Sequence, residues 1–167
     1  NNAVDFNDLI LFPIQLFKKN KSSLKAYQNL WKYILVDEFQ DTNSPQFELI
    51  SFLASGHQNI TVVGDDDQSI YSWRGAEIKN FLSFDKVYPN CKVFRLEQNY
   101  RSTKNILDAA SFLISHNKDR LGKKLWTDGV KGNSVKLNCY KNGKEEARGL
   151  SDVIEKNIKK KNRYFIY

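Results

Sequence analysis

The chain of 167 residues is 41% hydrophobic and 27% charged, a balance typical of a folded domain and not of a disordered segment. No apolar stretch approaches the roughly 18 residues that a membrane-spanning helix needs, and the polar start is not a signal peptide. Cys91 and Cys139 form no C-x-x-C pair, so neither a disulfide framework nor a zinc site is indicated, and a reducing, cytoplasmic setting is predicted.

The net charge of +7 is unevenly spread. Residues 1–100 carry 10 Lys and Arg against 12 Asp and Glu, whereas residues 101–167 carry 16 against 7. A basic half beside an acidic half is compatible with a polyanionic partner, but a lysine-rich solvated surface would give the same imbalance. Charge alone therefore leaves the partner open.

The first third of the chain predicts two helices and an acid-ended strand. Apolar side chains recur at helical spacing over residues 5–19, where Pro13 should kink or break the helix, and a second helix covers residues 22–31. The apolar run 33–36 then predicts a strand that leads into the acidic segment 37–42.

The same pattern is repeated further along the chain. Asn43 or Ser44 can cap a helix that has Pro45 just inside it, and the second apolar run, 60–64, leads into the acidic residues 65–67. A loop-like segment at 117–133 is either a surface excursion or the way into a second lobe. The remaining predictions are helices at 77–84, 106–114 with Ser102 as cap, and 144–160, and strands at 92–96, 135–140 and 164–167.

Helices and strands that alternate in this way predict an α/β fold with parallel strands. The carboxyl ends of parallel strands meet at one edge of the sheet, so both acidic segments should converge on one crevice. Carboxylates there are suited to hold Mg²⁺ and, through it, phosphate oxygens. The sequence therefore predicts a nucleotide-hydrolysing site.

Three groups of side chains fit such a site. Asp37 can hold Mg²⁺ while Glu38 activates water, although a strand that meets an acidic turn would look the same, and Asp41 is expected to tie down the loop or cap the next helix. Gln68 can contact a phosphate oxygen or position water. Arg101 can reach a transferring phosphoryl group, or it is simply an exposed loop arginine.

The aromatic residues around these groups predict stacking. Tyr71 and Trp73 would face one side of an extended segment beside Arg74, which would make a base-stacking platform. The alternative is that Trp73 belongs to the core. Tyr100 can stack on an adenine ring.

Residues 37–42, 63–76 and 96–102 resemble, in order and spacing, helicase motifs II, III and IV of the UvrD/PcrA/Rep family. Residues 5–9 resemble a segment that precedes motif II, and residues 120–127 resemble the UvrD branch in particular. The Asp-Asp-Gln-Ser run in motif III favours a simple motor over a helicase-nuclease. The resemblance spans nearly the whole chain.

This resemblance implies an ATP-dependent 3′-to-5′ DNA helicase of repair or replication, which acts on single-stranded DNA and on junctions with duplex DNA. It implies two RecA-like lobes with ATP between them. Residues 1–95 would be the C-terminal part of the first lobe (1A), and residues 96–167 the N-terminal part of the second (2A). Partners would be DNA, the remainder of the chain and possible repair proteins, without a membrane.

The resemblance also implies a role for each site residue. Asp37 and Glu38 would hold Mg²⁺, with Glu38 activating water, and Gln68 would sense the γ-phosphate and link it to the DNA site. Tyr100 would lie against adenine, and Arg101 would act as an arginine finger. The residues implied to meet DNA are Tyr71, Trp73 and Arg74.

The phosphate-cradling pattern G-x-x-x-x-G-K-[ST] does not occur in these residues, and neither do motifs V and VI. The chain is therefore expected to be a piece of a larger protein that alone neither hydrolyses ATP nor unwinds DNA. One alternative is a truncated, non-catalytic module that binds DNA or a partner. The other is a Mg²⁺-dependent phosphohydrolase or nuclease built from Asp37, Glu38, Asp65, Asp66 and Asp67.

Overall fold

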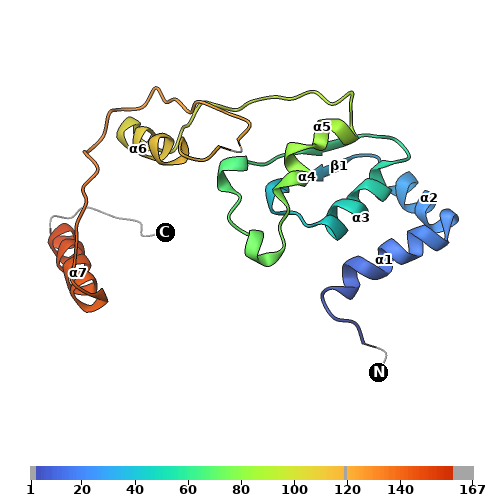
Figure 1. Ribbon diagram of the computed structural model, residues 1–167, viewed down its shortest axis with the longest axis horizontal. Coiled ribbons are helices and arrows are strands. Elements are labelled where there is room, and N and C mark those ends of the chain that lie inside the picture. Colours follow the sequence, from blue (N-terminus) through green and yellow to red (C-terminus); the bar gives the residue numbers. More distant parts are fainter. Residues whose placement is uncertain (1–2, 119, 160–167) are drawn as a thin grey trace.

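The computed structural model describes residues 3–118 and 120–159. The molecule is elongated, with helices α1 to α5 gathered toward one end and α7 at the other (Figure 1). The helices are α1 (Asp8–Lys19), α2 (Lys21–Leu30), α3 (Ser44–Ala54), α4 (Ile78–Leu82), α5 (Phe84–Val87), α6 (Lys104–Ile114) and α7 (Gly143–Lys159). Within the described ranges no helix has both the length and the apolar composition required to cross a bilayer.

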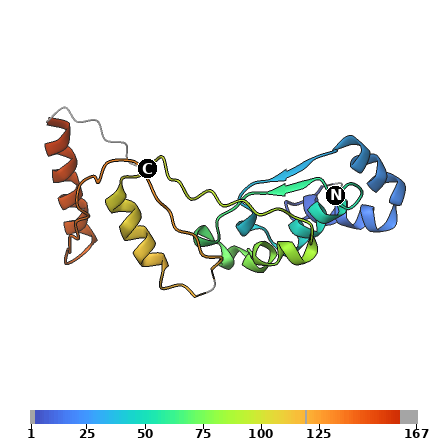
Figure 2. The same ribbon diagram turned by 90° about the horizontal axis from the view of Figure 1, so that it is seen from above.

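The sheet consists of two parallel strands, β1 (Ile34–Val36) and β2 (Ile60–Val62). Ile34 pairs with Ile60 and Val36 with Val62, and helix α3 forms the connection between the strands. Figure 2 shows the strands side by side, so the segments that follow them leave from the same edge. The predicted mixed α/β fold with parallel strands is confirmed to this extent.

Local capping explains where α3 begins. The Asn43 side chain accepts a hydrogen bond from the Gln46 N–H, and the Gln46 side chain accepts one from the Asn43 N–H, which makes a reciprocal capping box with Pro45 just inside. Asn43, not Ser44, is therefore the cap. The alternative that Asp41 caps this helix is wrong, because Asp41 lies in the preceding 3₁₀ turn, η1 (Phe39–Asp41).

Phe39 anchors the first acidic turn to the core. Its ring is completely buried and meets Phe47 of α3 and Phe84 of α5 edge-on, each at 5.5 Å between ring centroids. Phe81 of α4 lies 6.3 Å away. Because one side chain joins η1 to three helices, the backbone that carries the acidic residues is fixed by hydrophobic and aromatic packing.

The predicted break at Pro13 is wrong, since α1 is continuous through this residue. Proline removes one helical hydrogen bond, but Ile14, directly after it, and Phe17, about one turn further on, are both buried. The Phe17 ring packs 5.6 Å from Tyr27 of α2 and 6.4 Å from Phe52 of α3. Tertiary packing on both sides of α1 therefore outweighs the local preference.

The second half of the chain differs from the prediction in its strands. Residues 92–96 and 135–140 are not strands, and the described part of this half pairs only at an isolated bridge between Gln98 and Trp126. A strand needs a hydrogen-bonding edge, and these residues have none beside them. The helix predicted at 77–84 is interrupted at Ser83, which separates α4 from α5.

The last two long helices match the predicted ranges closely. Helix α6 begins at Lys104 with Thr103 in the cap position, so Ser102 is not the cap. Helix α7 covers residues 144–159 of the helix predicted at 144–160, whose last residue lies outside the described ranges. The strand predicted at 164–167 lies outside the described residues.

Candidate functional site

Asp37 and Glu38 follow β1 directly and are both exposed. Glu38 adopts a left-handed backbone conformation (φ 49°, ψ 41°), which non-glycine residues rarely enter and which is common at functional sites. Its N–H donates to Asp37 Oδ1 at 2.9 Å. Neither carboxylate forms an ion pair with another described residue, so both can receive a cation.

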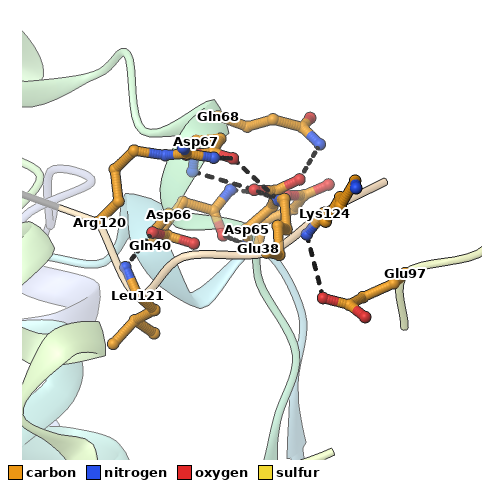
Figure 3. A network of polar contacts seen from close by, with 11 residues as sticks. Glu38, Gln40, Asp65, Asp66, Asp67, Gln68, Glu97, Arg120, Leu121 and Lys124 are labelled. Carbon is orange, nitrogen blue, oxygen red and sulfur yellow. Dashed lines mark hydrogen bonds and ion pairs between the residues drawn. The ribbon is translucent and has the colours of Figure 1, made fainter. Parts of the chain in front are cut away.

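The two acidic segments converge, as predicted from the parallel strands. The Phe39 N–H donates to the Val63 carbonyl at 3.0 Å, and this bond extends the sheet pairing beyond β1. Beneath the turn, the buried Gln40 side chain donates to Glu38 Oε2 at 2.8 Å and accepts from the Asp65 N–H at 3.0 Å (Figure 3). One side chain therefore connects the ends of both strands.

A cavity of about 370 Å³ opens beside the first acidic turn. Asp41 lines it, and Asp41 Oδ1 is buried without a hydrogen-bond partner among the described residues. Mg²⁺ is commonly held by one or two carboxylates together with phosphate oxygens, and the exposed carboxylates of Asp37 and Glu38 can supply that share. The full lining is Ile10, Val36, Asp37, Glu38, Asp41, Thr42, Gln46, Leu49 and Ile50.

The second acidic segment is occupied by cationic side chains of the same chain. Arg120 donates through Nε to Asp67 Oδ1 at 2.6 Å and through Nη2 to Asp67 Oδ2 at 2.7 Å, and only 18% and 12% of the two side chains is exposed. This bidentate pairing holds the pKa of Asp67 below its ordinary value, with Lys123 adding to the effect. The same bond raises the pKa of Arg120.

The neighbouring aspartates have partners in the same segment. Lys123 forms ion pairs with Asp65 and, at 3.5 Å, with Asp67. The Leu121 N–H donates to Asp66 Oδ2 at 2.8 Å. Figure 3 shows the segment that carries Arg120, Leu121 and Lys124 running along the acidic loop. The three aspartates thus bind residues 120–123, which are more than 50 positions away in sequence.

This pairing was not predicted, although three adjacent aspartates and a later segment rich in Lys and Arg offer complementary charge as a signal. It also bears on the alternative of a clustered-acid nuclease. Among residues 3–118 and 120–159 no three His, Cys, Asp or Glu side chains are arranged as metal ligands. This alternative needs all five acids together. Asp37 and Glu38 are exposed and form no ion pair among the described residues, whereas the three aspartates 65–67 are bound by residues 120–123.

Gln68 and the aromatic residues extend from the second acidic loop. Gln68 is exposed and donates to Asp65 Oδ2 at 2.7 Å, so it contacts its own loop and not Glu38. Trp73 lies within a 3₁₀ turn, η3 (Ser72–Arg74), and Tyr71 directly precedes this turn. The two residues are therefore not in an extended segment. Their ring centroids are 6.5 Å apart, and the Arg74 guanidinium lies 5.1 Å and 4.6 Å from them.

Trp73 is 73% exposed, so the alternative that it is a core residue is wrong in this structure. The guanidinium that packs on both rings holds them together through cation–π attraction. The result is an exposed cluster of two aromatic rings and one positive charge. Such a cluster can stack bases and attract a phosphate backbone.

Tyr100 and Arg101 lie in the second half, just before α6. Tyr100 is 86% exposed and donates from its hydroxyl to Gln98 Oε1 at 2.7 Å. Arg101 is exposed and its N–H donates to Asn99 Oδ1 at 2.9 Å. Within the described ranges, neither side chain makes a hydrogen bond or ion pair with Asp37 or Glu38, so the structure does not bring these residues to the first acidic turn.

Residues 1–89 match the family model of the UvrD/REP helicase N-terminal domain, and residues 94–166 match that of the UvrD-like helicase C-terminal domain. The chain therefore belongs to the UvrD/REP helicase family, in agreement with the motifs identified in the sequence.

Similar curated proteins agree with this assignment. The chain is 49% identical over 164 residues to a probable DNA helicase II homolog of Rickettsia conorii, covering 98% of this chain and 25% of the relative. It is 49% identical over 159 residues to DNA helicase II of Rickettsia typhi (95% and 24%). It is 47% identical over 164 residues to ATP-dependent DNA helicase PcrA of Staphylococcus epidermidis (98% and 22%). The chain thus spans about a quarter of the length of these relatives.

Proposed function

We propose that this chain is an internal part of an ATP-dependent DNA helicase that moves 3′ to 5′ on single-stranded DNA in repair or replication. Its membership of the UvrD/REP family and its similarity to proteins named DNA helicase II and PcrA support the proposal. The observation that carries it is the pair of open carboxylates on Asp37 and Glu38, joined by a buried amide to a loop that leads to exposed aromatic residues.

In this proposal residues 1–95 contribute to the first RecA-like lobe and residues 96–167 to the second. The boundary is supported by the two family matches, which end at residue 89 and begin at residue 94. An extended segment without helix or strand joins the two parts. Such a linker allows the parts to change their distance while the chain stays continuous.

Mg²⁺ and ATP would be held at the first acidic turn. Asp37 would hold Mg²⁺, which would neutralise phosphate charge, and Glu38 would accept a hydrogen bond from the attacking water and take its proton. Arg101 would reach the γ-phosphate as an arginine finger and Tyr100 would stack on adenine when the second lobe closes. Gln68 would report the γ-phosphate to the DNA side.

Single-stranded DNA would bind at the cluster of Tyr71, Trp73 and Arg74. Exposed rings accept bases of any sequence by stacking, and a guanidinium beside them attracts the phosphate backbone. Because this cluster belongs to the loop that begins at the end of β2, bound DNA and bound nucleotide would be connected by a short path through the protein.

The test is DNA-stimulated ATP hydrolysis and strand separation by the complete protein that contains this chain. We expect stimulation by single-stranded DNA and unwinding of duplexes with a 3′ overhang. The 167-residue chain alone should hydrolyse no ATP. Clear turnover by the chain alone, or none by the complete protein with DNA present, would contradict the proposal.

A second candidate is a non-catalytic module that binds DNA. The one observation that favours it is the exposure of the aromatic cluster. It predicts salt-dependent binding of single-stranded DNA by the 167-residue chain, lost in Trp73→Ala, with no ATP affinity in any longer form. ATP binding by the complete protein would eliminate this candidate.

A further inference from the structure

Gln40 is the most buried polar side chain in the described part of the molecule, with 1% of its surface exposed. It lies beneath the first acidic turn, between the two strand ends (Figure 3). A buried amide is stable only when its donor and acceptor groups are satisfied. Gln40 meets this requirement by contacting one group from each strand end.

The chemistry of the partners fixes the orientation of the amide. The Asp65 N–H is a donor, so only Gln40 Oε1 can face it, at 3.0 Å. The amide nitrogen must then face the other side, where it donates to Glu38 Oε2 at 2.8 Å. A weaker contact of 3.5 Å reaches Asp41 Oδ2. Gln40 cannot flip without losing both short bonds.

Gly64 makes this arrangement possible. A Cβ atom at position 64 would lie 2.5 Å from Gln40 Oε1 and 2.8 Å from the Phe81 ring. A side chain at position 64 would therefore crowd both the buried Gln40 amide and the Phe81 ring, which packs against Phe39. Only glycine therefore lets the amide oxygen reach the Asp65 N–H.

The bond network continues beyond Asp65. Asp65 Oδ1 accepts from the Asp67 N–H at 3.0 Å, and Asp65 Oδ2 accepts from Gln68 at 2.7 Å. The loop then leads to the cluster of Tyr71, Trp73 and Arg74. Hydrogen bonds thus connect the Glu38 carboxylate through Gln40 and Asp65 to Gln68, three residues before Tyr71.

We propose that Gln40 is a positioning residue that couples the Glu38 carboxylate to the loop after β2. This inference rests on the proposed helicase function. The amide holds one oxygen of Glu38, so the other is presented to water. When DNA engages the aromatic cluster and shifts the loop, the Asp65 N–H moves, and Gln40 transmits that movement to Glu38. DNA stimulation of ATP hydrolysis then depends on Gln40.

The experiment compares Gln40→Met, which keeps the side-chain volume but loses both bonds, with Gln28→Met in the complete protein. Gln28 is a matched control because its amide also joins two elements of the same unit, donating to the Phe52 carbonyl at 2.8 Å, far from the acidic turns. We expect Gln40→Met to lower the ratio of DNA-stimulated to basal turnover by about tenfold or more, while Gln28→Met leaves this ratio as in the wild type.

A double-variant cycle separates positioning from a structural effect. Gly64→Ala keeps the glutamine at position 40, but the added methyl group should push its amide oxygen away from the Asp65 N–H. If both act through one bond, the double variant should lose no more DNA stimulation than either single variant. Three results would each overturn the proposal. They are losses that multiply in the double variant, basal and stimulated rates that fall by the same factor, and DNA stimulation that survives in Gln40→Met.

A measurement on the unmutated protein covers the case in which a variant does not fold. The side-chain amide of Gln40, observed by selective ¹⁵N labelling, should shift when single-stranded DNA is added without nucleotide. An unchanged resonance in a protein whose ATP turnover DNA does stimulate would refute the role of Gln40. A wild-type protein without any DNA-stimulated turnover would instead refute the proposed function.

Discussion

The two strands of the sheet end in acid, but their carboxylates have opposite surroundings. After β1, Asp37 and Glu38 are exposed and have no cationic partner in the described residues. After β2, three aspartates are bound by Arg120, Lys123 and a backbone N–H. The first end can therefore receive a cation and its phosphates, whereas the second has its charge neutralised by the protein. Similar sequence patterns thus leave carboxylates open at one strand end and attach them to other residues of the chain at the other.

Removing the open carboxylate should have the largest effect. Glu38→Gln keeps the size of the side chain but cannot accept a proton from water, so ATP turnover by the complete protein should fall by up to about 10⁴-fold while ATP still binds. Steady-state turnover and nucleotide affinity provide the measurement. Glu48→Gln, a change at an exposed ion pair with Lys18, is the control. Turnover within tenfold of wild type in Glu38→Gln would mean that the first strand end is not catalytic.

Arg101→Ala tests whether the first strand end works with the second half of the chain. If Arg101 stabilises charge on the transferring phosphoryl group, turnover should fall by about 10³-fold with little change in ATP affinity. Arg148→Ala on α7 is the matched control, since Arg148 is also exposed. A near-normal rate in Arg101→Ala would leave it as an ordinary loop arginine.

Trp73→Ala tests whether the aromatic cluster that follows the second strand end binds DNA. Losing one stacking ring should weaken single-stranded DNA binding by about 1–3 kcal/mol, or roughly 5- to 150-fold, without altering ATP affinity. Fluorescence anisotropy of a labelled oligonucleotide measures this. Trp31→Ala removes an indole at the end of α2 that is 45% exposed, less than the 73% of Trp73, and this variant should bind DNA as wild type does. Equal losses in both variants would exclude a specific contact at Trp73.

Asp67→Asn should have the smallest effect, because it weakens only the attachment of residues 120–123 to the acidic loop. The pKa of Asp67 is lowered in the folded protein from its ordinary value of 3.8, so its stabilising contribution is complete above that value and is lost as pH falls through the lowered pKa. At neutral pH we expect hydrogen exchange at Leu121 to become about tenfold faster in Asp67→Asn. The difference should vanish at strongly acidic pH.

Asp85→Asn, a change at an exposed aspartate of α5, controls for the loss of one negative charge. Unchanged exchange at Leu121 in Asp67→Asn would show that the pairing with Arg120 does not hold the segment in place.

The two acid-ended strands could be read from the sequence, because they depend on local patterns. Apolar runs ending in acid predicted both strands and their convergence, and Asn43 with Pro45 predicted the start of α3. The exposure of Trp73 and the pairing of the three aspartates with residues 120–123 could not be predicted, since both depend on which side chains from distant parts of the sequence pack there. The bond from Arg120 to Asp67 joins residues 53 positions apart.

The wrong predictions have related causes. The segment 92–96 has the composition of a strand, but strand formation requires a neighbouring edge that composition does not reveal. Pro13 is a helix breaker by local rules, yet burial of Ile14 and Phe17 keeps α1 continuous. The role proposed for Gln40 could not be predicted, because it depends on contacts with both strand ends and no local pattern indicates a buried amide.

The most direct test of the difference between the strand ends is the position of the metal. Crystals of the complete protein with Mn²⁺ and a non-hydrolysable ATP analogue would reveal the ion by its anomalous scattering, since Mn²⁺ replaces Mg²⁺ at oxygen ligands. We predict Mn²⁺ at the carboxylate of Asp37, beside Glu38, with Arg120 still paired to Asp67. Mn²⁺ bound among Asp65, Asp66 and Asp67, with Arg120 and Lys123 displaced, would contradict the assignment of the two ends.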